Sequence, residues 1–350
     1  MKNPLISITL LLAAQIASSQ VLAKELSCPA GLDCTQGNVL LTSESTASIY
    51  VDGQYTGQKT PAMLNLSNDK HIVGVGLDQE RVYYRKEITT TDQPSHVHLT
   101  AKDQPTPATW KALFVGVPHA FGKSGGKTCS THFDKQDLDK AFEFFKFNMR
   151  AHIEPYSYGT VQWEIERRDL SVPVELSYNP ENQWYTLEAE QGLAELDNVN
   201  PGKYDTVFYF WREEQADCSF KSGYFGLAWL DPTADESRQT GYVTVKFNPG
   251  TIGVGKTLAK YKNNDPGVWT HEWLHVVIEQ FYPNRDVKVP LPPKDKLILH
   301  AAEAYGYQYP WLDWYKDLIS GQVPFGKTFT GIGPEALLAC TIVDAAKGKC

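Results

Sequence analysis

The stretch THEWLHVVIEQFYP, residues 270–283, decides which fold and which chemistry the second part of the chain is expected to have. Upstream, Asp265 and Pro266 form a good helix start, because the carboxylate can cap the helix and proline lacks only an N–H that would stay unbonded there. Pro283 provides a stop. The sequence therefore predicts a helix over His271–Phe281.

The two histidines of this helix are spaced for a shared metal ion. At about 100° per residue, His275 lies about 40° from His271 on the helical wheel and about one turn along the axis, so both imidazoles can reach one ion. Glu272 comes off the edge of the same face, where a carboxylate can reach a metal-bound water without binding the metal. Zinc bound here would lower the pKa of that water to about 7, and Glu272 would take its proton.

The same motif also has an interpretation without metal. Four apolar residues share or border the histidine face, so the segment could be a core helix with two hydrogen-bonded histidines; these are Val268, Leu274, Ile278 and Tyr282. The zinc interpretation is favoured because an alternating strand precedes the helix, the helix has a clear start, and a third ligand is at hand.

Metal sites of this class need a third protein ligand and leave a fourth position open for water. The segment DKLILHAAEAYGYQYP, residues 295–310, offers two candidates on a helix that Asp295 can cap. His300 and Glu303 are three apart, so they project from one helical face. His300 could donate to the developing oxyanion or take the third ligand place itself, and Asp313 is a further candidate for that place.

The spacing after the motif separates two known classes of zinc peptidase. The extended metzincin pattern, H-E-x-x-H-x-x-G-x-x-H, requires a glycine and a histidine where this chain has Ile278 and Phe281. What remains resembles the gluzincins, zinc peptidases of the thermolysin type, in which a glutamate on the next helix completes the site. The resemblance implies three zinc ligands and a general base, which are His271, His275 and Glu303 with Glu272 as the base.

Other residues near the motif have two interpretations each. Glu279 is either the partner of a metal ligand or an exposed carboxylate. Tyr305, Tyr307 and Tyr309 could offer a phenol to an oxyanion, although packing is favoured. The strand Tyr242–Phe247 could bind an extended peptide along its edge or could lie inside a sheet.

Residues 1–23 are predicted to be a secretory signal peptide. Lys2 is followed by an apolar run from Leu5 to Ile16 and by Val21-Leu22-Ala23, a small-x-small cleavage site. No later stretch is long and apolar enough to span a membrane, so we expect a secreted or periplasmic protein without a span after signal removal. The remaining 32 Lys and Arg stand against 41 Asp and Glu, a net charge of −9, which argues against nucleic acid or an anionic membrane as partner.

The six cysteines are an even number in a chain with an export signal, which favours disulfides. Six cysteines allow fifteen connectivities. Proximity in the sequence favours the pairs Cys28–Cys34 and Cys340–Cys350, which leaves Cys129–Cys218. No C-x-x-C pair is present, so a cysteine zinc site is disfavoured.

Short alternating segments separated by turn signals such as Asp52-Gly53 dominate residues 48–100. The stretch ASIYVDGQYTGQKTPAMLNLSNDKHIVGV resembles the PEGA family of bacterial exported proteins, whose pattern is a strand, a D-G turn, G-x-x-T-P and a strand opened by G-x-H. Asp69-Lys70-His71 departs from the last part of that pattern. The resemblance implies a β-sandwich-like accessory module with a surface or cell-wall partner; the alternative is a β-rich spacer without a ligand.

The predicted fold class is α+β. We expect a β-rich PEGA-like module over 24–101, a stiff proline-containing linker over 102–109, and a zincin-like domain with a mixed sheet and an active-site helix over 110–350. The expected elements of the last part are a strand over 112–117, a helix capped by Asp134, and strands over 160–165, 206–211 and 242–247.

These features predict an exported, zinc-dependent endopeptidase that hydrolyses a protein or peptide substrate through a zinc-activated water, with Glu272 as the general base. One alternative is a catalytically inactive zincin-fold protein that acts in binding or adhesion. Another is a zinc hydrolase of cell-wall amide substrates, because specificity lies in pocket shapes that no motif encodes.

Overall fold

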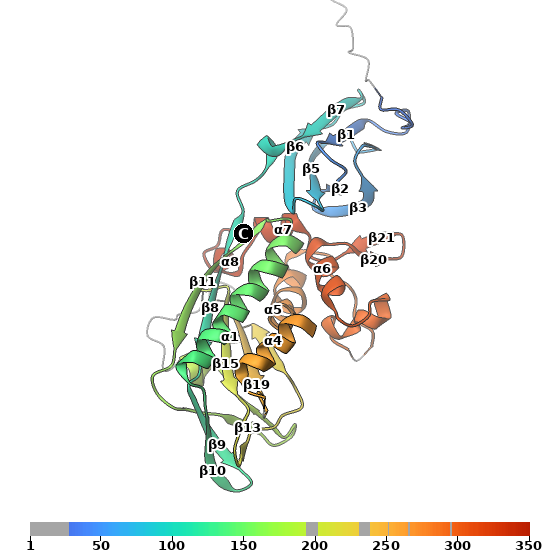
Figure 1. Ribbon diagram of the computed structural model, residues 1–350. Coiled ribbons are helices and arrows are strands. Elements are labelled where there is room, and N and C mark those ends of the chain that lie inside the picture. Colours follow the sequence, from blue (N-terminus) through green and yellow to red (C-terminus); the bar gives the residue numbers. More distant parts are fainter. Residues whose placement is uncertain (1–27, 194–201, 231–238, 251, 265–266, 295) are drawn as a thin grey trace, which may run out of the picture.

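The computed structural model describes residues 28–350 except 194–201, 231–238, 251, 265–266 and 295. These residues form a small all-β unit followed by a larger unit of helices and strands (Figure 1), so the predicted α+β class is confirmed. The signal peptide, the helix start at Asp265-Pro266 and the Asp295 cap lie outside the described residues.

Two sheets make up the small unit. In chain order its strands are β1 (Val39–Ser43), β2 (Ser48–Val51), β3 (Gln54–Lys59), β4 (Ala62–Leu64), β5 (Lys70–Leu77), β6 (Val82–Thr89) and β7 (Ser95–Leu99). One sheet has the order β4-β1-β7 and the other β3-β2-β5-β6. Alternate side chains from both sheets, including Val39, Ile49 and Val75, fill a common core, as the alternating sequence predicts.

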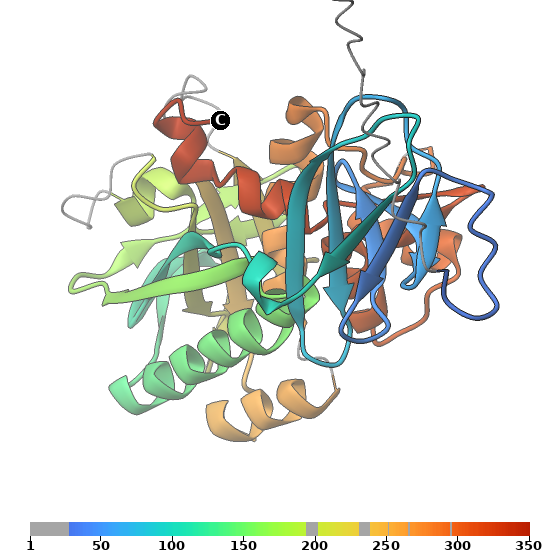
Figure 2. The ribbon, with the colours of Figure 1, turned by 90° about the horizontal axis from the view of Figure 1, so that it is seen from above.

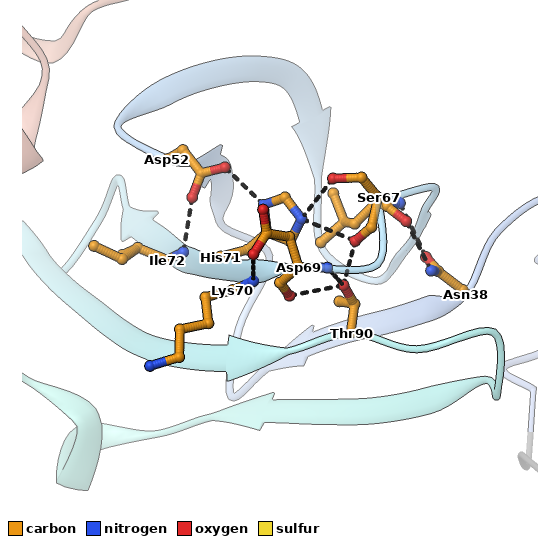
Figure 3. Close-up of polar contacts among 9 residues, drawn as sticks. Asn38, Asp52, Ser67, Asp69, Lys70, His71, Ile72 and Thr90 are labelled. Atoms are coloured by element: carbon orange, nitrogen blue, oxygen red, sulfur yellow. Dashed lines mark hydrogen bonds and ion pairs between the residues drawn. The ribbon is translucent and has the colours of Figure 1, made fainter.

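Asp52 fixes the turn between β2 and β3 to the start of β5 (Figure 3). Its carboxylate accepts a hydrogen bond of 2.8 Å from the N–H of Ile72 and lies 2.7 Å from Nδ1 of His71, whose Nε2 is 3.0 Å from the carbonyl oxygen of Ser67. The bond to Asp52 raises the pKa of His71. Asp52 adopts φ 48°, a left-handed conformation that aspartate tolerates in turns, as the Asp-Gly signal predicts.

A five-stranded sheet is the centre of the larger unit. Its order is β11 (Val161–Asp169), β8 (Ala108–Gly116), β15 (Thr206–Arg212), β19 (Gly241–Phe247) and β18 (Gly226–Leu230). The first four strands are parallel, and β18 joins the edge antiparallel to β19. The strand predicted over 242–247 therefore lies inside the sheet, and the edge beside it belongs to β18.

Helices cover one face of this sheet. They are α1 (Lys135–Asn148), α4 (Val254–Asn264) and α5 (Val268–Val276), which lie together on one side of the strands in Figure 1. The Asp134 side chain caps α1, accepting a bond of 2.7 Å from the N–H of Asp137, as predicted. Aromatic side chains of the sheet pack on these helices, with Trp110 against Trp273 and Phe114 against Trp269.

Shorter elements lie around this sheet and complete the described chain. The strands are β9 (His119–Ser124), β10 (Lys127–His132), β12 (Val174–Glu175), β13 (Ser177–Asn179), β14 (Trp184–Thr186), β16 (Glu214–Gln215), β17 (Cys218–Ser219), β20 (Val323–Phe325) and β21 (Thr328–Thr330). The helices and turns are η1 (Ala101–Asp103), η2 (Met149–Ile153), α2 (Glu154–Tyr156), α3 (Ala189–Leu193), η4 (Val277–Phe281), η5 (Tyr282–Arg285), η6 (Leu299–Tyr305), α6 (Leu312–Ser320), α7 (Pro334–Ala339) and α8 (Ile342–Ala346). None of the helices among the described residues is long and apolar enough to cross a membrane.

Three disulfides cross-link the chain. They join Cys28 to Cys34, Cys129 to Cys218, and Cys340 to Cys350, so the pairing favoured by the sequence is confirmed. The middle bond ties strand β10 to β17 across 89 residues.

The small unit packs against the C-terminal elements of the larger one, as both Figure 1 and Figure 2 show for α6, α7 and the β20–β21 hairpin. The hydroxyl of the buried Tyr50 donates 2.8 Å to the carbonyl oxygen of Ser320, at the end of α6. Nε2 of Gln322 donates 2.8 Å to the hydroxyls of both Tyr50 and Tyr158. The two units therefore share a buried, hydrogen-bonded interface.

Candidate metal centre

Helix α5 brings the two histidines of the opening motif together. Its apolar side chains, among them Trp269 and Trp273, are buried in the sheet–helix core and hold the helix in place. Nε2 of His271 and Nε2 of His275 lie 3.1 Å apart. The i, i+4 spacing therefore places both imidazoles at one point, as predicted from the sequence.

His300 completes a cluster of three histidines. It lies on the 3-10 helix η6, with its ring stacked 5.4 Å from that of His271 and edge-on, 5.1 Å, to that of His275. Each of the three residues offers a nitrogen within 4.8 Å of the nitrogens of the other two. Three imidazole nitrogens with room for a fourth ligand are a donor set that suits zinc.

The structure does not bring Glu303 into this cluster. Glu303 is exposed and lies one turn beyond His300 on η6, and Asp313 is exposed on the following helix α6. The ligand set implied by the gluzincin resemblance therefore differs from the set that the fold assembles, in which His300 stands where Glu303 was expected.

The carboxyl group of Glu272 is buried beside the histidines. It packs against Gly226 of the edge strand β18, where a Cβ atom would lie 2.5 Å from its Cδ, so only glycine leaves room for it. Within the described part of the chain, Oε2 of Glu272 has no hydrogen-bond partner. Burial raises the pKa of Glu272 to about 7. A carboxyl group with this pKa can take up and release a proton near neutral pH.

Two side chains orient the imidazoles through their second nitrogens. The hydroxyl of Tyr315, on α6, lies 3.0 Å from Nδ1 of His271. Oε2 of Glu279 lies 2.7 Å from Nδ1 of His275. A partner at Nδ1 fixes the ring and leaves Nε2 free to bind a metal.

Glu279 also ties the motif to the segment that carries His300. Its second oxygen accepts a hydrogen bond of 3.0 Å from the N–H of Leu299, the residue before His300. Its side chain is only 11% exposed. Of its two predicted roles, the structure therefore supports the partner of a histidine over the exposed carboxylate.

The environment sets the charge of the histidines. Burial and the neighbouring His275 lower the pKa of His271 well below its usual value, which favours the neutral imidazole that binds metals. Burial also opposes the charged form of His275, but the hydrogen bond with Glu279 and the negative charges of Glu279 and Glu272 together outweigh it and raise the pKa of His275.

The histidines and Glu272 line a cavity of about 780 Å³ between α5, β18 and α6. Aromatic side chains make up much of its wall; they are Trp184, Tyr224, Phe225, Tyr261, Trp311 and Tyr315. The three tyrosines predicted to pack do not line it. The hydroxyls of Tyr305 and Tyr307 bond to Leu291 and Asp317, away from the cavity.

Sequence reasoning missed Tyr315, Gly226 and Gln280 as members of the site. Tyr315 follows His300 on another helix, with no motif of its own, and Gly226 begins a strand that the sequence did not indicate. Gln280 was visible inside the motif stretch, next to Glu279, and helical periodicity gives it no special place.

A comparison of the sequence with models of known protein families gives no match, and a comparison with curated proteins gives none either.

Proposed function

We propose that the protein is an exported, zinc-dependent peptidase with a zincin-like catalytic unit and a PEGA-like unit before it. One observation carries the proposal. Three histidines converge at one point of a cavity, directly beside a buried glutamate whose Oε2 has no hydrogen-bond partner among the described residues. A core helix with two structural histidines would require neither the third histidine nor an unpaired buried carboxylate.

His271, His275 and His300 are the proposed zinc ligands. All three are supported by the spacing of their nitrogens, and the first two also by their bonded Nδ1 atoms. The site thus keeps the H-E-x-x-H helix expected of zincins and takes histidine as its third ligand in place of the glutamate of gluzincins.

A zinc ion held there would act as a Lewis acid toward the scissile carbonyl and the attacking water. Glu272 accepts a proton from that water at its carboxylate and later gives it to the nitrogen of the leaving amine, so that the broken C–N bond yields an acid and an amine. Tyr315 and Glu279 keep the imidazoles oriented, and the aromatic walls bind the substrate and exclude water.

Export and the accessory role belong to the same proposal. Three disulfides favour an oxidising compartment, either the periplasm or the medium, in line with the predicted signal peptide. The all-β unit is proposed to contact a surface or cell-wall partner while it stays docked on the catalytic unit.

Metal analysis tests the proposal and separates the two possible third ligands. Wild-type protein should hold about one zinc per chain, as a site with three protein ligands does. The His300→Ala variant should lose most of it, whereas Glu303→Ala should retain it. Wild-type protein without stoichiometric zinc would refute the proposal, and zinc loss only in Glu303→Ala would restore the gluzincin ligand set.

A further inference from the structure

The edge strand β18 presents its backbone to the cavity at alternate residues. The carbonyl of Phe225 accepts from the N–H of Lys246 on β19, so it faces into the sheet. In an antiparallel pair successive residues alternate, and Gly226, Ala228 and Leu230 therefore direct their N–H and C=O groups outward. An extended peptide in the cleft would pair with these outward groups.

Gln280 already occupies the far half of this edge. Its Oε1 accepts a hydrogen bond of 2.6 Å from the N–H of Leu230, and its Nε2 donates to the carbonyl of Ala228 at 3.5 Å. The same Nε2 donates 3.2 Å to the carbonyl of His275. The amide thus joins the motif helix to β18 and stands where a substrate strand would pair.

The π-helix η4 places this side chain. Glu279 and Gln280 are neighbours in η4, yet Glu279 reaches toward Leu299 while Gln280 reaches β18. Turns of this kind within helices frequently occur at functional sites, because they re-aim side chains.

Among the described residues, no side chain bonds to the near half of the edge, and this half leads to further space. Because Glu272 packs against Gly226, the proposed mechanism would put the scissile bond at this end of β18. A second cavity of about 730 Å³ shares its walls with the first; the shared residues are Trp184, Gly223, Tyr224, Phe225 and Tyr261. Phe225, which lines both cavities, is 59% exposed.

We infer that Gln280 closes the cleft on the Leu230 side, so that the protein cleaves peptides close to one chain end. This inference rests on the proposed peptidase function. From Gly226 to Ala228 the open edge matches roughly two residues of extended chain. The substrate extends freely only toward Phe225 and the second cavity. The inferred activity is therefore cleavage near one end of a peptide, whereas the sequence predicts an endopeptidase, which cleaves within a chain.

Peptides lengthened one residue at a time at either end test the inference, with zinc-loaded full-length protein and cleavage positions mapped by mass spectrometry. For wild type, residues added on the side that extends toward Phe225 should leave kcat/KM unchanged or raise it. A residue added beyond roughly two on the other side should lower kcat/KM about tenfold, the effect of losing one or two hydrogen bonds. Gln280→Ala and Gln280→Asn, whose side chains cannot reach β18, should both remove that loss, so that within each variant the longer and the shorter peptides are cleaved with equal kcat/KM.

Asn284→Ala is the matched control. Its side chain donates 3.0 Å to the carbonyl of Gln280 and leaves the Gln280 side-chain amide in place, so this variant should keep the wild-type length dependence. Equal tolerance at both ends in wild type, or an unchanged length dependence in both Gln280 variants, would overturn the inference alone. Zinc-loaded wild type that cleaves none of the peptides would overturn the proposed function and the inference with it.

Discussion

Glu272 is the residue on which the proposed chemistry depends. Its replacement by glutamine keeps the volume beside Gly226 but removes the proton acceptor, so Glu272→Gln should lower hydrolysis by about 10²- to 10⁴-fold. Zinc content should stay at the wild-type level, because the three clustered histidines are the proposed zinc ligands and Glu272 is not a ligand. The paired measurement is peptide turnover and elemental analysis on the same preparation.

Glu303→Gln is the control for that substitution. Glu303 is an exposed glutamate outside the cluster, so turnover should not change. Undiminished hydrolysis by Glu272→Gln would contradict the mechanism.

Glu279 should control metal affinity without binding metal. Glu279→Ala removes the partner of His275 Nδ1 and the acceptor of the Leu299 N–H at once, and loss of such partners typically weakens metal binding about 10- to 100-fold. Competition with a chelator of known affinity measures this. Asp313→Ala, which removes an exposed carboxylate of α6, should bind zinc as wild type does. Equal affinities for both variants would show that Glu279 has no positioning role.

Residue spacing predicted part of this site. His271, Glu272 and His275 follow from helical geometry alone, because all three are within one turn of one helix. The choice between His300 and Glu303 did not follow, because residues three apart share a face in either helix type and differ only in height along it. Which of the two residues reaches the cluster depends on the position of η6 relative to α5. The connection from Arg285 to Leu299 sets this position, and no periodic sequence pattern predicts the path of that connection.

At the scale of elements, the chain beyond the motif differs from a regular helix. The predicted helix over His271–Phe281 is confirmed as helical, but its last turn is the π-helix η4. Helical periodicity cannot reveal the π-helix. In this turn Gln280 and Glu279 bond to Leu230 of β18 and Leu299 of η6, which are distant in the sequence. The predicted helix after Asp295 is likewise a short 3-10 turn.

Asp205 anchors the C-terminal helix α8 to β15 and gives stability a defined pH dependence. Its buried carboxylate accepts from the N–H groups of Lys111 and Val343. Burial raises the pKa of this carboxyl group from its usual value of 3.8 to about 6. Below about pH 4 both folded and unfolded chains hold this proton, and between pH 4 and 6 only the folded chain does. The contribution to stability is therefore lost as pH rises, by up to about 3 kcal/mol.

The measurement is denaturant unfolding of wild type and Asp205→Asn from pH 4 to 7. The stability of wild type relative to the variant should decrease as pH rises through about 6. Asp139 is the control of opposite sign, because bonds from Lys135 and Arg167 lower its pKa. The contribution of Asp139 should be lost only below about pH 4, so the stability difference for Asp139→Asn should stay constant from pH 4 to 7. A stability difference for Asp205→Asn that does not change with pH would contradict the assignment.

On the scale of the whole molecule, the docked interface should make the two units unfold together. Tyr50→Phe removes the hydroxyl that bonds to Ser320 and Gln322, and a lost buried hydrogen bond should cost about 1–3 kcal/mol. Chemical unfolding followed by tryptophan fluorescence measures it, since Trp110 and Trp273 belong to the larger unit. Tyr178→Phe, at a half-exposed tyrosine, should have no effect. Equal stability of both variants would mean that the interface contributes nothing.

The sequence predicted the two units but not their contact. Alternation and turn signals over residues 48–100 indicated a β unit, and the prolines after Lys102 indicated a stiff linker. The interface uses Tyr50, which in the sequence is one more strand residue, together with Gln322 in a short loop after α6. Contacts between residues so far apart produce no local sequence pattern, because neither Tyr50 nor Gln322 stands out among its neighbours in the sequence.

The contact between Tyr50 and Ser320 joins residues 270 positions apart. Chains emerge from the ribosome and from an export channel with the N-terminus first, and early units fold as they appear. The β unit is therefore complete long before the surface that receives it has been made. The hydroxyl of Tyr50 can bond to Ser320 only after the chain has been made almost to its end, so this contact closes late in folding.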